Sequence, residues 1–240
     1  MTYDNIRRAV FLDRPNRFIA HIELDGRTEV CHVKNTGRCR ELLIPGAEVF
    51  VQDVGRGLPD APNPRKTTLD LISVRKGERL VNIDSAAPNK VFAEWARDSG
   101  LFRDITLVRP EYRFGNSRLD FYIEADGRRV LVEVKGVTLE EEGIARFPDA
   151  PTERGIKHLR GLITAVEEGY DACAVFVIQM KGVRWMEPNR ETHAAFGDAM
   201  RDARKAGVNV LAVDCHITGN SITVADFVDV RTDTSRRERS

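Results

Sequence analysis

Alternating apolar and polar positions define the most distinct element of the chain, a β-hairpin over residues 117–135. Asp126-Gly127 gives the turn, because a type I′ turn needs positive φ at both central positions. With that turn, Phe121 faces Val132 and Asp120 directly faces Glu133. One face of the hairpin then carries six apolar residues suited to a core, namely Leu119, Phe121, Ile123, Val130, Val132 and Val134.

The opposite face of this hairpin brings two carboxylates together beside a lysine. Like charges placed directly across a strand pair destabilise it, so Asp120 and Glu133 need a reason to face each other. A divalent cation, Mg²⁺ or Mn²⁺, supplies one, because hard cations take carboxylate oxygens. Lys135, two residues along the same face, can then polarise a metal-bound water or a phosphate. We therefore predict Asp120, Glu133 and Lys135 as a catalytic set, the first two as metal ligands.

Residues 1–84 are dominated by short β-type segments separated by Gly and Pro. The expected strands cover residues 10–12, 18–24, 28–33, 48–52 and 69–74, with one helical turn at 39–43. Five short strands with one helical insertion favour a small Greek-key barrel, with an OB-fold as the leading candidate.

Two barrel loops carry basic residues beside small polar ones: Lys34, Asn35 and Arg38 in the first, Arg65 and Lys66 in the second. Backbone amides near a glycine, together with Lys and Arg, can hold phosphates. Solvated loop charges explain the same composition equally well.

The second part of the chain, residues 85–230, begins with a helix that Asn89 would cap and Gly100 would end. Its buried stripe comprises Val91, Phe92, Trp95 and Ala96. Glu94 lies at the edge of that stripe, where its carboxylate could lean toward the hairpin and add a metal ligand. A solvated helix glutamate is the more common arrangement.

Residues 136–151 read as a loop, after which Thr152 caps a helix with a period-3.6 apolar face. Arg154, Lys157 and His158 share an adjacent stripe near the start of this helix. Basic groups there add to the positive end of the helix dipole and favour an anion such as phosphate. Taken alone, His158 is better explained as a histidine at the surface or core edge.

The remaining elements are a buried strand at 173–179, a helix at 191–206 and a buried strand at 208–213. The order of helix, three antiparallel strands, helix, strand, helix and strand predicts an α/β (α+β) domain with a mixed sheet flanked by helices. Residues 231–240 are charged and lack apolar side chains, so a frayed tail is expected.

Composition narrows the function classes. The chain has 240 residues, with 37 Lys and Arg balanced by 37 Asp and Glu. Zero net charge excludes a uniformly basic nucleic-acid coat but allows a local basic cleft. The four cysteines lack CxxC spacing, which favours buried free thiols in a reducing compartment over zinc. No apolar run is long enough to span a bilayer, so we expect a cytoplasmic protein with no membrane partner.

The element order, with Asp in the second strand and Glu-x-Lys in the third, resembles the PD-(D/E)XK nuclease-like fold. Short sequence motifs along the rest of the chain narrow this resemblance to one family. The matching stretches are FIA (18–20), HVKNTGR (32–38), ELLIPG (41–46), RKT (65–67), PN (88–89), SRLDF (117–121), VEVKGVTL (132–139) and FPDAPTERGIKHL (147–159). Over nearly its whole length, the chain resembles the sugar fermentation stimulation protein A family.

This resemblance implies an N-terminal OB-fold joined to a PD-(D/E)XK-like domain, in a cytoplasmic protein described as DNA-binding. In some members it also implies a link to the expression of maltose-metabolism genes. The nuclease-type positions carry over as Asp120, Glu133 and Lys135. Glu94 falls on the helix that often supplies a further carboxylate, and Gln179, a candidate phosphate contact, ends the strand after the second helix. The tail after Val228 is longer and more charged than the family's.

Three functional classes follow from these observations. The first is a DNA-binding protein with Mg²⁺-dependent nuclease activity, for which single-stranded DNA or RNA remain alternative substrates. The second is a protein that binds DNA without cutting it. The third binds or hydrolyses a small phosphorylated or nucleotide ligand with the same carboxylate pair. We place DNA binding first; the oligomeric state is left open.

Overall fold

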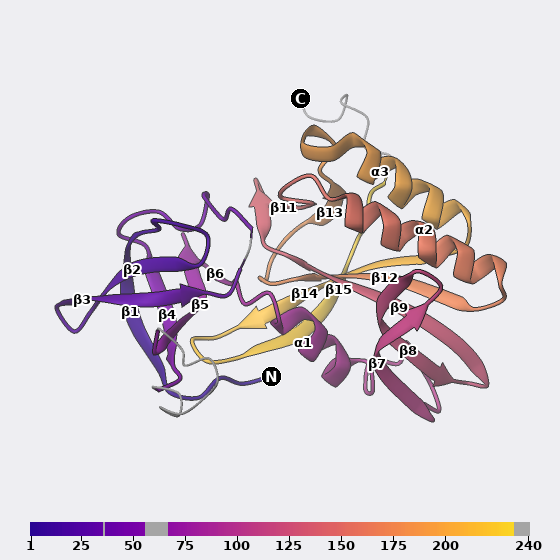
Figure 1. The fold of residues 1–240 in the computed structure, drawn as a ribbon, viewed down its shortest axis with the longest axis horizontal. Coiled ribbons are helices and arrows are strands. Elements are labelled where there is room, and N and C mark those ends of the chain that lie inside the picture. The colour runs from indigo at the N-terminus through magenta and orange to yellow at the C-terminus, as the bar shows by residue number, and fades with distance from the viewer. Residues whose placement is uncertain (36, 56–66, 233–240) are drawn as a thin grey trace.

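The computed structural model describes residues 1–35, 37–55 and 67–232. Figure 1 shows two lobes: a barrel formed by the first part of the chain, and a larger lobe with a central sheet and three helices. The lobes are joined where the last barrel strand leads into the first helix. This is the predicted order of a barrel followed by a mixed α/β domain.

The first lobe is a closed five-stranded barrel with one added strand. Sheet neighbours run in the order β3-β2-β1-β4-β5-β6, and an additional parallel β3–β5 pairing closes the barrel. Its strands are β1 (Ile6–Asp13), β2 (Ile19–Leu24), β3 (Arg27–Val33), β4 (Glu48–Asp53), β5 (Leu69–Lys76) and β6 (Arg79–Asn82). The OB-like barrel is thus confirmed, and the four-residue β6 is an addition to the predicted strands.

The second lobe is built on a six-stranded mixed sheet in the order β15-β14-β12-β9-β8-β7. The β9–β12 and β12–β14 pairings are parallel, and the outer pairings are antiparallel. Its elements are α1 (Ala87–Trp95), β7 (Leu107–Phe114), β8 (Ser117–Ala125), β9 (Arg128–Val137), α2 (Glu153–Glu167), β12 (Asp171–Ile178), α3 (Arg190–Lys205), β14 (Asn209–Ile217) and β15 (Ile222–Val228). β15 is an addition to the predicted order.

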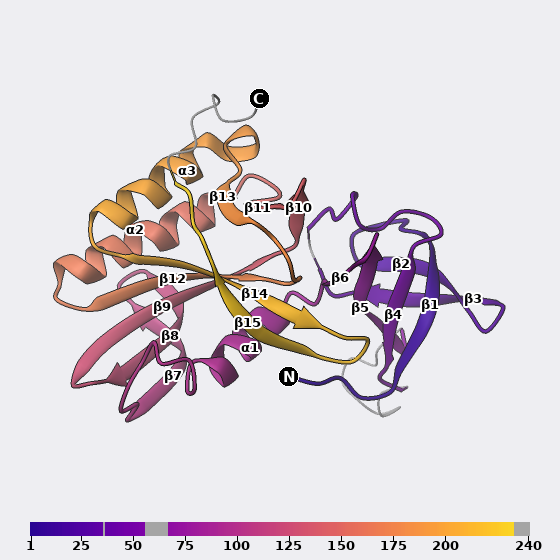
Figure 2. The same cartoon turned by 180° about the vertical axis from the view of Figure 1, so that it is seen from behind.

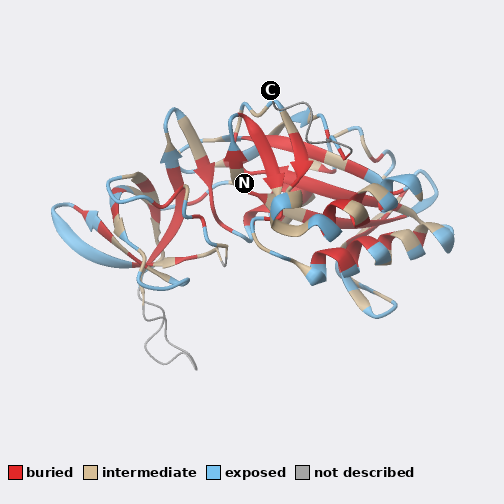
Figure 3. Cartoon of the chain, turned by 90° about the horizontal axis from the view of Figure 1, so that it is seen from above, coloured by how far each residue is buried: buried red, intermediate tan, exposed pale blue. Residues whose placement is uncertain are grey.

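Helices cover both faces of this sheet, α2 and α3 on one side and α1 on the other (Figures 1 and 2). The alternation of β12 serves both sides: Ala174 and Phe176 pack under α2 and α3, whereas Cys173 and Val175 pack with α1. Figure 3 shows the central strands buried, while the outer faces of the helices are exposed. The predicted mixed sheet flanked by helices is therefore confirmed.

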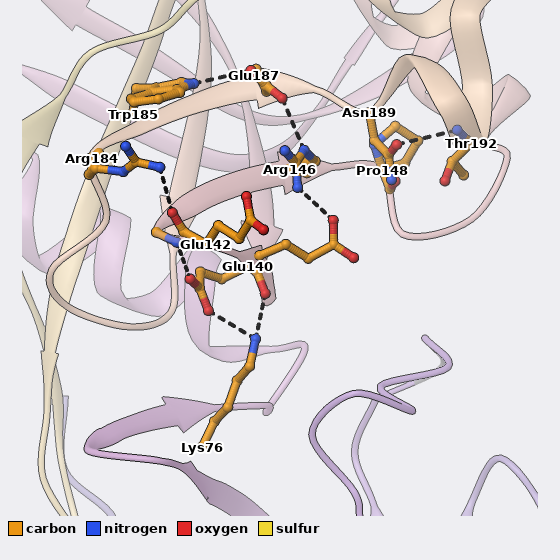
Figure 4. Close-up of polar contacts among 12 residues, drawn as sticks. Lys76, Glu140, Glu142, Arg146, Pro148, Arg184, Trp185, Glu187, Asn189 and Thr192 are labelled. Atoms are coloured by element: carbon orange, nitrogen blue, oxygen red, sulfur yellow. Dashed lines mark hydrogen bonds and ion pairs between the residues drawn. The ribbon is translucent and has the colours of Figure 1, made fainter. Parts of the chain in front are cut away.

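Residues 136–151 were predicted to form a loop, and this prediction is wrong because the segment contains two strands. β10 (Leu139–Glu141) and β11 (Ile144–Phe147) form a small sheet with β13 (Trp185–Pro188). These strands carry charged residues that sequence patterns assign to loops. Here Arg146 and Glu187 are buried because they pair with each other, Arg146 Nε lying 3.0 Å from Glu187 Oε1 (Figure 4).

Helix α1 begins earlier and ends earlier than predicted. Its N-cap is Ala86, with Pro88 in the first turn, where the missing N–H of proline has no intrahelical partner to lose. Asn89 is therefore inside the helix and does not cap it. The helix ends at Trp95, and Gly100 lies in the following loop with φ of 69°.

The four cysteines are buried and free, as predicted. Burial raises the pKa of each thiol to about 12. In the part of the chain that the structure describes, no helix is both long enough and apolar enough to cross a membrane.

A buried polar junction joins the barrel to the second lobe. Gln179 Nε2 donates to Asn82 Oδ1 at 2.9 Å and to the Asp84 carbonyl at 3.0 Å. Asp84 Oδ2 in turn accepts from Lys34 Nζ at 2.7 Å. Gly136 lies against this junction so closely that a Cβ there would come within 2.5 Å of Gln179 Oε1. Strand β9 and the two lobes are thus held together at one crowded point.

A second contact between the lobes is the buried carboxylate of Glu140 on β10. Lys76 Nζ from the barrel lies 2.9 Å from Glu140 Oε2, and Arg79 Nη1 lies 2.7 Å from Oε1. Figure 4 shows Lys76 reaching Glu140 beneath the small sheet. Burial alone would raise the pKa of Glu140, but hydrogen bonds from Lys76, the Gly143 amide and Arg79 outweigh it and lower the pKa.

We expect Gly136→Ala to reduce the free energy of unfolding by about 1–3 kcal/mol, because its methyl group would overpack the junction. The matched control is Gly161→Ala in α2, where the new Cβ meets nothing closer than 3.7 Å. That change should raise stability by about 0.5–1 kcal/mol, since Gly is less favourable than Ala inside a helix. Urea unfolding of both variants measures the two effects. Equal stabilities would contradict the crowding at Gly136.

We expect Glu140→Gln to lower the free energy of unfolding at pH 7 by about 1–3 kcal/mol, because Lys76 and Arg79 lose a buried charged acceptor. The folded-state pKa of Glu140 is depressed. Its contribution is therefore present above the unfolded value, about 4.3, and is lost as pH falls through the folded value. Denaturant unfolding of wild type and variant from pH 7 to acid should show the two curves converging.

The neighbouring variant Glu141→Gln serves as the control, because the Glu141 side chain is 61% exposed and its ion pair with Arg146 is partly solvated. Such pairs contribute about 0–1 kcal/mol. A pH-independent gap between wild type and Glu140→Gln would contradict the role given to the Glu140 charge.

Candidate active site

The predicted hairpin register holds as far as the site and then ends. β8 and β9 pair from Ala125–Arg128 to Phe121–Val132, as the Asp126-Gly127 turn dictates. The expected pair of Asp120 with Glu133 lies beyond the last pair of this ladder. Asp120 instead reaches the β9 backbone, and its Oδ2 accepts from the Val134 amide at 2.8 Å. The strands separate where the two carboxylates lie.

The alternation of β8 also breaks at Asp120. Phe121 is in the apolar cluster that includes α1, but Leu119 is buried in the other cluster, under α2. The predicted apolar face of six residues is therefore wrong at Leu119. On the neighbouring strand β7, Glu111 has φ of 54°, a conformation that non-glycine residues adopt at a steric cost. Glu111 lies opposite Asp120 in the β7–β8 register, so the irregularity of β7 coincides with the break in the alternation of β8.

Two hydrogen bonds fix the half-buried carboxylate of Asp120. Asn89 Nδ2 on α1 donates to Oδ1 at 2.8 Å, and the Val134 amide holds Oδ2. Burial raises the pKa of Asp120, and the nearby negative charge of Glu133 raises it further. The Glu133 charge is thus close enough to disfavour ionisation of Asp120.

Glu133 is buried and asymmetrically bonded. Its Oε1 is in close contact with both Lys135 Nζ and His158 Nδ1. Burial tends to raise the pKa of Glu133, but the hydrogen bond to His158 and the Lys135 charge outweigh it, so the pKa is lowered. Its other oxygen, Oε2, is buried and has no hydrogen-bond partner within residues 1–35, 37–55 and 67–232. An ionised carboxylate therefore presents one unsatisfied oxygen.

Helix α2 supplies the basic side of the site. Thr152 caps the helix as predicted, with its hydroxyl oxygen accepting from the Gly155 amide at 3.0 Å. The next turns carry Arg154 and His158. Arg154 Nε lies 3.4 Å from His158 Nε2, which fits the tautomer in which Nδ1 carries the proton toward Glu133. The Arg154 guanidinium is thus placed beside the carboxylates.

These side chains line one open pocket of about 720 Å³. Five predicted residues meet there, namely Asp120, Glu133, Lys135, Arg154 and His158. Helix α1 adds Asn89 and Lys90, and the turn after it adds Arg97; sequence reasoning missed all three as site residues. The sequence could have indicated two of them. With Phe92 facing the core, residues 89, 93 and 97 form the neighbouring stripe at helical spacing.

Three other predicted residues lie elsewhere. Glu94 is 58% exposed and binds the amino group of Met1 at 2.6 Å, so it does not lean toward the hairpin. Lys157 donates to the Asn116 carbonyl at 2.9 Å, outside the pocket. Gln179 is buried in the junction, where its amide group bridges the two lobes.

The barrel residues have different surroundings. Lys34 pairs with buried Asp84, and Asn35 Oδ1 accepts from the Gly37 amide at 2.7 Å. Arg38 is exposed. Arg65 and Lys66 lie outside the described residues.

The chemistry of the pocket suits a small hard cation and a phosphate. Within the described ranges, no three His, Cys, Asp or Glu side chains converge as a complete metal-binding group. Asp120 and Glu133 would therefore need water, a substrate oxygen or a backbone carbonyl such as that of Val134 to complete a cation's shell. This leaves positions open for reacting oxygens.

Comparisons with known proteins agree on one family. Residues 12–83 match the family model of the SfsA N-terminal OB domain, and residues 86–221 match that of the sugar fermentation stimulation protein RE domain. The "sugar fermentation stimulation protein homolog" of Desulfitobacterium hafniense (strain Y51) is 58% identical over 96% of this chain and 98% of its own length. Its Clostridium beijerinckii counterpart is 55% identical over 96% of this chain and 99% of its own.

A solved structure supports the same assignment. SfsA of Pyrococcus furiosus, whose structure is described as a complex with Ca²⁺, is 27% identical. It superimposes with a TM-score of 0.85 over 96% of this chain and 98% of that one. With both lobes matched at this coverage, the chain belongs to the sugar fermentation stimulation protein family.

Proposed function

We propose that the protein binds DNA and hydrolyses phosphodiester bonds with Mg²⁺ or Mn²⁺ held between Asp120 and Glu133. The observation that carries this proposal is Glu133 Oε2, a buried carboxylate oxygen for which the described part of the chain supplies no hydrogen-bond partner. Leaving such a group unsatisfied costs about 1–3 kcal/mol or more. A cation bound by this oxygen and by Asp120 would remove that penalty and the repulsion between the carboxylates.

The donor set fits such a cation, because carboxylate oxygens are the ligands that Mg²⁺ and Mn²⁺ prefer. The Ca²⁺ named for the Pyrococcus furiosus relative supports divalent-cation binding in this family. Asn89 and the Val134 amide would keep the Asp120 carboxylate aligned, while His158 and Lys135 hold Glu133 by its other oxygen.

In the proposed reaction, a water oxygen attacks phosphorus, the ester P–O bond breaks, and the leaving oxygen takes up a proton. A bound Mg²⁺ or Mn²⁺ would polarise the phosphoryl oxygens and lower the pKa of a coordinated water. Lys135 would orient the attacking water, and Arg154 would stabilise negative charge on the phosphate in the transition state. His158 would keep Glu133 ionised and in place.

DNA binding would account for the link to maltose metabolism that the family resemblance implies. The four buried free thiols support the proposed cytoplasmic location, where thiols stay reduced.

A small phosphorylated or nucleotide ligand is the second candidate. The pocket combines exposed Lys90 and Arg97 with an apolar wall of Ala93, Val108 and Phe121, which suits a compact ligand as well as one nucleotide of a chain. Substrate choice distinguishes the two: the first proposal expects metal-dependent cleavage of a long strand, whereas the second expects no strand cleavage and instead binding or hydrolysis of a mononucleotide.

We expect wild-type protein to cleave DNA with Mg²⁺ or Mn²⁺ and to stop when EDTA is added. Glu133→Gln and Lys135→Ala should each reduce the cleavage rate by at least about 10²-fold, the scale of losing one electrostatic contributor. Glu94→Gln is the matched control, because Glu94 lies outside the pocket and should leave the rate unchanged. Time courses on single- and double-stranded DNA and on RNA provide the measurement.

Metal binding gives a readout that does not depend on turnover. Mn²⁺ should raise the thermal midpoint of wild type and of Glu94→Gln but not that of Glu133→Gln. A midpoint shift that persists in Glu133→Gln would place the cation elsewhere and overturn this part of the proposal.

We expect Arg154→Ala to weaken DNA binding and to reduce the slope of log K against log salt by about 1, because one phosphate contact is lost. Lys157→Ala, three residues further along α2, is the control; its amino group is held on the Asn116 carbonyl. Fluorescence anisotropy at several salt concentrations with EDTA present measures binding without cleavage. Identical slopes for Arg154→Ala and wild type would exclude Arg154 as a phosphate contact.

A further inference from the structure

The side chain of Arg14 organises one edge of the barrel. Its guanidinium donates to four backbone carbonyls: Nη1 to Gly37 at 3.1 Å and Arg38 at 2.8 Å, and Nη2 to Arg17 at 2.6 Å and Asn35 at 2.9 Å. One cation thus fastens the segment before β2 to the loop after β3. Without it, four carbonyl groups of two irregular segments would lose a shared partner.

The segments held by Arg14 include one exposed aromatic residue and two exposed arginines. Phe18 is 55% exposed, although its backbone is fixed: its amide donates to Asn16 Oδ1 at 2.9 Å, and its carbonyl accepts from Val33 at 2.8 Å. Arg17 and Arg38 are exposed, and their carbonyls accept from the same Arg14 guanidinium. Among the described residues, neither arginine has a carboxylate partner. We call Arg17, Phe18 and Arg38 the barrel platform.

The barrel platform continues toward the candidate active site. Asn35 and Gly37, whose carbonyls Arg14 holds, line a crevice of about 150 Å³ between the lobes together with Ser85 and Gly136. Ser85 also lines the catalytic pocket, and Gly136 directly follows Lys135. The pocket and the crevice therefore share Ser85, and the crevice leads to the loop that Arg14 holds.

We propose that the barrel platform binds a single-stranded segment of the nucleic acid whose phosphate lies in the catalytic pocket, with an unpaired base stacked on Phe18. This inference rests on the proposed function and specifies its substrate class. A solvated phenyl ring on a fixed backbone offers a flat face to a base, and Arg17 and Arg38 offer charge to the adjoining phosphates. In a duplex, the base faces already stack on one another and are closed to Phe18.

The carboxylates near the platform do not cancel this charge. Asp13 binds His21, with 2.9 Å between Oδ1 and Nδ1. Asp149 lines the crevice and lies against Gly37, on the side of the loop that faces the second lobe. The platform itself keeps its positive charge for a polyanion.

Binding of fluorescently labelled oligothymidine, measured by anisotropy with EDTA present, tests the proposal. Phe18→Ala should weaken binding about tenfold, the scale of losing one stacked base, whereas Phe18→Trp should retain it. Binding of a blunt duplex of the same length should be unchanged in both variants. Phe227→Ala is the matched control, because Phe227 is 58% exposed on β15, where it packs against Trp95 and lines neither pocket.

The outcomes separate this inference from the proposed function. Wild type that binds oligothymidine as tightly as Phe18→Ala would overturn the barrel platform and leave the catalytic pocket intact. Equal losses on oligothymidine and duplex would also overturn it, because stacking on an unpaired base would not be the cause. Failure of wild type to bind any nucleic acid at low salt would overturn the proposed function itself.

Discussion

The buried negative charge of Glu133 is the constraint around which the second lobe is arranged. Removing a carboxylate from water is costly unless charged partners and hydrogen bonds replace the lost hydration. His158 comes from α2 and Lys135 from β9 itself, and together they lower the pKa of Glu133 despite its burial. Because both bind the same oxygen, they offset this cost only in part, and Oε2 is left without a hydrogen-bond partner among the described residues.

The same constraint links the site to the barrel. Lys135 is followed at once by Gly136, whose close approach to Gln179 and Pro88 leaves no room for a side chain. Gln179 bonds to Asn82 and Asp84 at the end of the barrel, and Pro88 precedes the Asn89 that holds Asp120. A movement of the barrel relative to the sheet would therefore disturb both carboxylates. The two lobes act as one support for the pocket.

Much of this arrangement could be predicted because local chemistry and tertiary structure agree. The Asp126-Gly127 turn sets the hairpin register, and the period-3.6 apolar face predicted after Thr152 is the buried face of α2. Prediction failed where tertiary contacts override local pattern. Charged β10, β11 and β13 form a sheet because buried Glu140, Arg146 and Glu187 find partners from distant segments.

Within the site, the residues that sequence reasoning identified were those whose charges are unusual for their strand or helix position. Asn89 was missed because an asparagine after Pro88 also fits a helix cap. The N-cap is in fact Ala86, so Asn89 lies inside the helix, where its side chain bonds to Asp120. Glu94 illustrates the opposite error. A helix was correctly predicted around Glu94. However, the stripe of α1 that faces the pocket and the stripe that faces solvent differ by one residue position. Glu94 is on the solvent stripe, where its carboxylate pairs with the amino group of Met1.

Charge placement explains how a chain of zero net charge could hold a polyanion. Lys135 and Lys34 are neutralised by Glu133 and Asp84, so neither is free to attract phosphate from a distance. Among the cations that have no carboxylate partner in the described part of the chain, Lys90, Arg97 and Arg154 line the pocket, and Arg17 and Arg38 are exposed on the barrel. A mononucleotide could engage one group only. A polymer that spans the crevice at Ser85 could engage both, so the spacing of these charges favours a chain over a small ligand.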